Sequence, residues 1–243
     1  MPLSYGSVFR CARLAALLLA SASAITGCNG LVSSDVADVP VDLPDRQFTV
    51  DTASWQIADG AAVSYLGTSC EARPGVCDAA AQAACNAGCS GACDAVTHTC
   101  DLALAVQLYQ AIDVGKEQPN VASIGDATSV QMKIDHVTYE VTGNTLDLDT
   151  PELTVYVAPA SVTAPGPMAK AIGTIAPVSA GHITDAQALA FTASGQADLS
   201  AAMSSYDTPF NILVGATLVL HDGDLPPTGK LDARIHIAAH AGL

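Results

Sequence analysis

The chain has little positive charge. Nine Lys and Arg residues stand against 24 Asp and Glu residues, which gives a formal net charge of −15 at pH 7. Such an acidic surface repels phosphate backbones, so the composition argues against nucleic-acid binding. The acidity favours solubility at a crowded surface, and the alternative is affinity for basic partners or weakly bound divalent cations. Aromatic residues make up only 5% of the chain, which leaves few side chains for a platform on which sugars or bases could stack.

Catalytic motifs are missing as well. The sequence contains no G-x-S-x-G, no H-E-x-x-H and no G-x-x-x-x-G-K-[ST]. These patterns are typical of serine hydrolases, zinc proteases and P-loop NTPases, respectively. We therefore predict no catalytic residue and no cofactor.

The N-terminal stretch lacks the length of a membrane helix. Arg10 and Arg13 precede an uncharged run from Leu14 to Ile25, whereas spanning a bilayer takes roughly twenty apolar residues. A basic start, a short apolar run and then small residues are typical of a secretory signal. We assign this signal to residues 1–27.

The signal ends in the tetrad Ile25-Thr26-Gly27-Cys28, which resembles the lipobox of bacterial lipoproteins. The resemblance implies that Cys28 receives a diacylglycerol, that cleavage occurs before it, and that the new amine is acylated, for example with palmitate. Two or more acyl chains anchor a protein stably, whereas one binds marginally, at about 10⁴ M⁻¹. Asn29 is not the Asp that holds such proteins in the inner membrane, so the resemblance implies an outer-membrane location, facing the periplasm or the surface. The alternative is an ordinary secretory signal followed by a chance cysteine.

Cysteine usage agrees with export. Beyond Cys28, six cysteines cluster in one part of the chain: Cys70, Cys77, Cys85, Cys89, Cys93 and Cys100. An even number in an exported chain predicts three disulfides, and spacing does not choose among the fifteen possible pairings. Metal binding by the Cys-x3-Cys-x3-Cys series beside His98 is the alternative, although the paired C-x2-C of zinc sites is missing.

The chain ahead of the cysteines divides into two parts. Residues 28–45 are acidic and interrupted by prolines, which predicts a flexible tether; the alternative is that Val39 to Leu43 docks as an edge strand. Residues 46–101 are predicted to hold a short strand and the cysteine-rich module, with Trp55 in the core and Asp78 capping a short helix.

Residues 102–243 show mainly the two-residue alternation of β-strands. Apolar residues alternate along 102–108, 130–134, 137–141, 153–157, 210–220 and 231–237. The change of parity between Ile134 and Val137 predicts a bulge near Asp135-His136. One helix is predicted to begin after Ser194 and to bury Met203. The turn-rich stretch 222–229 predicts a hairpin with a long loop.

About seven strands without βαβ alternation predict a mainly β fold. We expect an antiparallel β-sandwich, immunoglobulin-like at a coarse level, with a short helix and a disulfide-rich N-terminal insertion. The pattern resembles the immunoglobulin-like modules of bacterial surface proteins only at that level. A closed β-barrel is the alternative.

A few acidic and histidine residues could hold a metal ion. The strongest candidates are His221, Asp222 and Asp224, because loop oxygens suit divalent cations, although Asp-Gly is also a common turn dipeptide. Asp147 and Asp149 are predicted to share one face of a strand. His236 and His240 are expected on the polar face of the last strand, about 13 Å apart and too far for one ion.

These features lead to two functional hypotheses. The first is a non-catalytic, lipid-anchored lipoprotein of the cell envelope or surface that acts as a binding, adhesion or structural module. The second is a metal-dependent envelope hydrolase that uses the loop with His221, Asp222 and Asp224.

Overall fold

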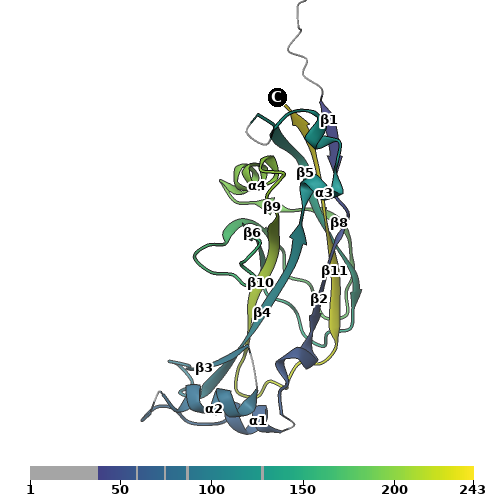
Figure 1. Ribbon diagram of the computed structural model, residues 1–243. Coiled ribbons are helices and arrows are strands. Elements are labelled where there is room, and N and C mark those ends of the chain that lie inside the picture. Colours follow the sequence, from purple (N-terminus) through teal and green to yellow (C-terminus); the bar gives the residue numbers. More distant parts are fainter. Residues whose placement is uncertain (1–37, 59, 74, 86–87, 127–128) are drawn as a thin grey trace, which may run out of the picture. The chain divides into compact units, whose positions relative to one another are not determined.

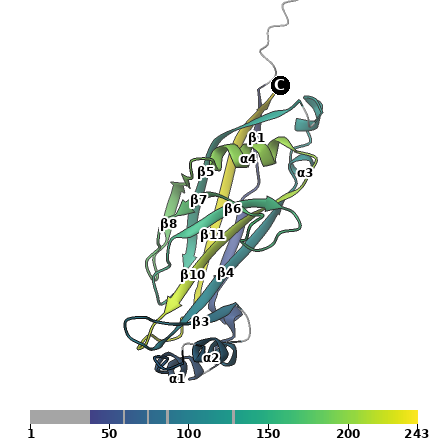
Figure 2. The same ribbon diagram turned by 90° about the vertical axis from the view of Figure 1, so that its left-hand side faces the viewer.

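The computed structural model describes residues 38–243 apart from 59, 74, 86–87 and 127–128. In this part of the chain, two antiparallel sheets pack face to face as a sandwich, and no closed barrel forms (Figures 1 and 2). The predicted sandwich is confirmed and the barrel alternative is wrong. The predicted signal at residues 1–27 and Cys28 lie outside the described residues.

The first sheet has the strand order β1-β11-β5-β8, with β2 also paired to β11. Its strands are β1 (Val39–Asp42), β2 (Arg46–Asp51), β5 (Gln131–Asn144), β8 (Thr184–Ala188) and β11 (Lys230–Gly242). The second sheet has the order β3-β4-β10-β6-β7-β9. Its strands are β3 (Cys89–Cys93), β4 (Cys100–Ile112), β6 (Leu153–Pro159), β7 (Lys170–Ile175), β9 (Ala190–Phe191) and β10 (Phe210–Leu220).

Helices occupy both ends of the sandwich. Helix α4 (Gly195–Ser204) packs on β5 and β7, whereas α1 (Ala61–Leu66) and α2 (Val76–Ala84) lie with β3 at the opposite end (Figures 1 and 2). The remaining short helices are η1 (Thr52–Trp55), α3 (Val114–Glu117) and η2 (Val121–Ser123). The helix predicted after Ser194 is confirmed, and Met203 is fully buried.

Alternation along the strands builds the core as predicted. Leu102 and Leu104 on β4 are fully buried, whereas Ala103 between them is only partly buried. On β5 the buried parity changes where β11 shifts register, because Ala238 pairs with His136 and Ala239 with Ile134. Asp135 is therefore the extra residue of the predicted bulge.

Strand β1 replaces part of the predicted tether. Residues 39–42 pair with β11, and Val41 and Leu43 are buried. The tether prediction is wrong for this stretch, and the edge-strand alternative is right. Two alternating apolar side chains supply enough burial to dock the segment, while the acidic residues beside them remain on the solvent side.

The predicted hairpin between the last two strands is also wrong. Strand β10 belongs to the second sheet and β11 to the first, so residues 221–229 cross from one sheet to the other. Alternation of apolar residues indicates that a strand has one buried face. Strands of both sheets of a sandwich show the same alternation, so the pattern does not reveal to which sheet a strand belongs. A connection of this length easily spans the roughly 10 Å between packed sheets.

Residues 46–101 are not structurally separate from 102–243. Strand β2 pairs with β11, and β3 pairs with β4. Helix α2 begins at Val76 with Gly75 as its N-cap, so Asp78 lies in the first turn and is not the predicted cap. A carboxylate there still interacts favourably with the positive end of the helix dipole.

Candidate functional site

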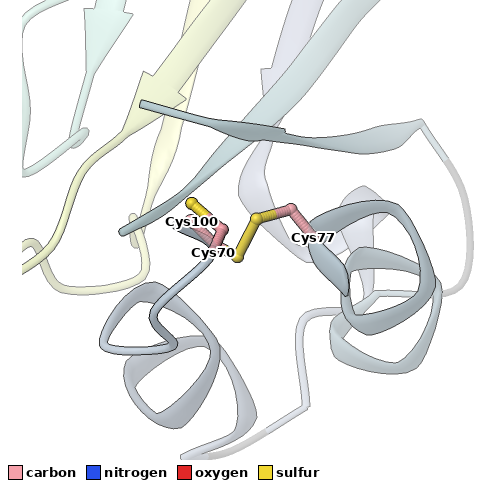
Figure 3. Close-up of side chains that lie close together, drawn as sticks. All are labelled: Cys70, Cys77 and Cys100. Carbon is pink, nitrogen blue, oxygen red and sulfur yellow. A yellow bond between two sulfur atoms is a disulfide. The ribbon is translucent and has the colours of Figure 1, made fainter. Parts of the chain in front are cut away.

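The six clustered cysteines form three disulfides. The pairs are Cys70–Cys93, Cys77–Cys100 and Cys85–Cys89. Figure 3 shows Cys70, Cys77 and Cys100 side by side, and their sulfur atoms lie within 4.8 Å of one another. Each of these sulfurs is already bonded to another sulfur, so the predicted disulfides are confirmed and the metal alternative for the cysteines is wrong.

The disulfides fasten β3 and β4 to the small helices. Cys77 lies on α2 and is bonded to the first residue of β4. At Gly91 on β3, an added Cβ would come within 2.2 Å of the carbonyl oxygen of Cys77 and of the Tyr65 hydroxyl. The strand therefore lies so close to the helices that only glycine fits there.

Beside these disulfides lies a cluster of polar side chains, here called the His221 cluster: Asp94, Asp101 and His221. One ligand atom from each lies within 4.8 Å of those of the other two. The imidazole Nδ1 of His221 is 2.9 Å from Oδ1 of Asp101. The Asp101 side chain is 13% exposed and the His221 side chain 59% exposed, so the cluster opens to solvent on the imidazole side.

Local structure positions the two aspartates of the His221 cluster. Asp94 and Asp101 directly follow Cys93 and Cys100, which pair with each other across β3 and β4. Oδ1 of Asp94 accepts hydrogen bonds from the backbone N–H groups of Val96 at 2.6 Å and Thr97 at 2.7 Å. These bonds hold the carboxylate in place on the turn between the two strands.

Within the His221 cluster, charged groups shift the pKa values of His221 and Asp94. The hydrogen bond from His221 to Asp101 raises the pKa of the imidazole, and the nearby charges of Asp101, Asp224 and Asp94 act in the same direction. The backbone N–H groups of Thr97 and Val96 lower the pKa of Asp94, and the charge of His221 adds to that effect. The site therefore attracts positive charge.

The structure corrects the sequence-predicted set of His221, Asp222 and Asp224. Oδ2 of Asp224 accepts a hydrogen bond from the backbone N–H of His221 and so shapes the turn. Asp222 is not a member of the metal-competent group, and Asp94 and Asp101 take its place. Leu102 pairs with Leu220 in the β4–β10 ladder, so the next residues, Asp101 and His221, come together.

Sequence reasoning missed the two aspartates because they are distant from His221 along the chain. A usable signal existed in the alternation of residues 102–108 and 210–220. If those strands had been paired with the right register, residue 101 would have been placed near residue 221. Alternation alone does not provide that register.

Asp147 and Asp149 have structural partners. Asp147 accepts hydrogen bonds from the backbone N–H and the hydroxyl of Thr228, and Asp149 accepts one from the N–H of Ala180. Both residues precede β6 and lie outside any strand, so the predicted shared strand face is wrong. Their carboxylates hold the loops between the strands together.

The last-strand histidines face acidic residues on the outer face of the first sheet. Nδ1 of His236 is 3.1 Å from Asp45, and Nδ1 of His240 is 2.7 Å from Asp135. Both side chains are about one-third exposed. Each imidazole has its own carboxylate partner, which agrees with the prediction that the two are too far apart to share one ion.

An apolar groove lies between β6 and α4. It has a volume of about 640 Å³, and its lining includes Val157, Phe210 and the exposed Met168. An ion pair between Lys170 and Asp198, 2.7 Å long, lies in the same groove. The groove therefore combines an apolar lining with one ion pair.

Among the described residues, no helix has the length and apolar character needed to cross a membrane. Comparisons with protein-family models, with curated proteins and with solved structures gave no match.

Proposed function

We propose that the chain is an exported, lipid-anchored and non-catalytic lipoprotein whose β-sandwich serves as a binding, adhesion or structural module of the cell envelope. The observation that carries the proposal is the set of three disulfides. Such bonds form and persist in oxidising compartments and are rare in the cytosol. They agree with the secretory signal and the lipobox tetrad that precede them in the sequence.

The docking of β1 supports a short link between anchor and sandwich. Pairing with β11 begins at Val39, and ten residues, 29–38, lie between Cys28 and that point of the chain. A chain of that length reaches at most roughly 35 Å when fully extended. A sandwich attached in this way stays close to the bilayer surface, which suits an envelope module.

Metabolic labelling with a radioactive fatty acid tests the proposal in a bacterial host. The unaltered chain is expected to take up label and to sediment with membranes. Cys28→Ala is expected to lose the label and to leave the membrane fraction, because the acyl chains have no other acceptor. Cys11→Ala, a cysteine change within the predicted signal, is the matched control and should label normally. Continued labelling or membrane retention of Cys28→Ala would refute the proposal.

A further inference from the structure

We propose that Asp94, Asp101 and His221 form a binding site for a divalent transition-metal ion of the Zn²⁺ class. An imidazole nitrogen with carboxylate oxygens is a common zinc ligand set. The residues come from three segments, namely the β3–β4 turn, the start of β4 and the end of β10, and their ligand atoms lie within 4.8 Å of one another. The inference does not depend on the proposed function.

The distances allow one ion to be shared. Ligand atoms around a tetrahedral zinc ion with bonds of about 2.0–2.1 Å lie roughly 3.3 Å apart. The separation of 2.9 Å between His221 Nδ1 and Asp101 Oδ1 is close to that value. The other separations are within 4.8 Å, so the ligand atoms need to move by no more than about 1.5 Å relative to one another to reach that spacing.

The carboxylates are positioned in advance by the disulfides. Cys93 and Cys100, which precede the two aspartates, are each bonded to another segment of the module. Oδ1 of Asp94 is held by the backbone N–H groups of Val96 and Thr97. Because these ligands are largely fixed before binding, little conformational entropy is lost when an ion arrives.

The ligand chemistry separates transition metals from calcium. Ca²⁺ takes six to eight oxygen ligands, whereas the His221 cluster offers one nitrogen and two carboxylates. Three protein ligands leave a coordination position for water, as in open zinc sites. We therefore expect Zn²⁺ to bind much more tightly than Ca²⁺.

Isothermal titration of the full chain, purified in detergent and stripped with a chelator, tests the site with Zn²⁺ as the only added ligand. The expected result is one saturable site per chain. Asp101→Asn and His221→Gln are each expected to raise the dissociation constant for Zn²⁺ roughly tenfold or more. Even the loss of a residue that only hydrogen-bonds to a metal ligand lowers metal affinity by that factor. Ca²⁺ is expected to bind at least tenfold more weakly than Zn²⁺.

Two matched controls locate the ion. Asp222→Asn removes the neighbouring carboxylate, and His182→Gln removes an imidazole from another loop; neither should change the affinity. If Asp101→Asn does not fold, as judged by circular dichroism, His221→Gln decides the matter, because that side chain is mostly exposed. The absence of a one-to-one site, an equal effect of Asp222→Asn, or comparable affinity for Ca²⁺ would each overturn the assignment.

Discussion

At the scale of single residues, Trp55 shows how a buried side chain meets a distant partner. It is the only tryptophan of the chain and is 5% exposed. Its indole N–H donates to the carbonyl oxygen of Ala105 on β4, a partner fifty positions away. Apolar character predicts that such a ring is buried, whereas the acceptor is chosen by how the two sheets approach each other. The same limit explains why His221 was recognised but Asp94 and Asp101 were not.

Tyr65 provides a prediction at this scale. Burial, helped by the charges of Asp78 and Asp101, raises the pKa of its phenol to about 12, and the hydroxyl donates to the backbone oxygen of Asp101. The folded state therefore resists ionisation of Tyr65 more than the unfolded state, whose pKa is 10.0. The stability that this gives is complete below pH 10 and is lost as the pH rises towards about 12.

Ultraviolet absorbance of tyrosinate measures this titration. Subtracting the curve of Tyr65→Phe from that of the unaltered chain should leave one group that ionises near pH 12. A difference curve centred at pH 10 would show that the phenol is not shielded in the way that the structure indicates.

At the scale of helices and strands, the local alternation of apolar residues predicts where strands lie, but it does not predict which strands pair with each other. The strands at 102–108, 153–157 and 210–220 were recognisable because one face of each is buried. The sheet to which each strand belongs depends on contacts distant in sequence, which explains the mistaken hairpin between β10 and β11. Strand β8 was missed because nearly all of its side chains are exposed, so it carries no alternation.

A glycine at the start of α4 allows a prediction about how this helix packs. A Cβ at Gly195 would lie 1.8 Å from the carbonyl oxygen of Ile172 on β7, which is backbone and cannot rotate away. We expect Gly195→Ala to lower the free energy of unfolding by about 3 kcal/mol or more. The matched control is Gly166→Ala, where a Cβ meets nothing within 4 Å; it should change the free energy by about 0.5 kcal/mol or less. Urea unfolding followed by circular dichroism compares them, and equal midpoints would contradict the close packing of α4 on β7.

At the scale of the whole molecule, the disulfide Cys77–Cys100 joins the cysteine-rich module to the sandwich by linking α2 to β4. The sequence predicted three disulfides from the even number of cysteines, but their pairing required the fold. Cys77–Cys100 closes a loop with a sequence separation of 23, whereas the separation in Cys85–Cys89 is 4. A cross-link that closes a longer loop removes more entropy from the unfolded chain.

Removal of each disulfide should reveal this difference. The double change Cys77→Ala and Cys100→Ala is expected to cost about 3 kcal/mol of unfolding free energy, and Cys85→Ala with Cys89→Ala about 2 kcal/mol. Removing Cys77–Cys100 should lower the unfolding free energy by more than the loop length alone implies, because both cysteines are fully buried. Chemical denaturation of the two variants measures the difference. A larger loss from the Cys85–Cys89 pair would contradict the role assigned to Cys77–Cys100.

Export and anchoring through Cys28 are tested most directly by mass spectrometry of the N-terminal peptide of the protein isolated from its native membrane. We expect that peptide to begin at Cys28 and to carry a diacylglycerol on sulfur and a further acyl group on the amine. An unmodified Cys28 thiol, or a chain that still retains residues 1–27, would contradict the proposal that a lipid holds this disulfide-bonded sandwich at the cell envelope.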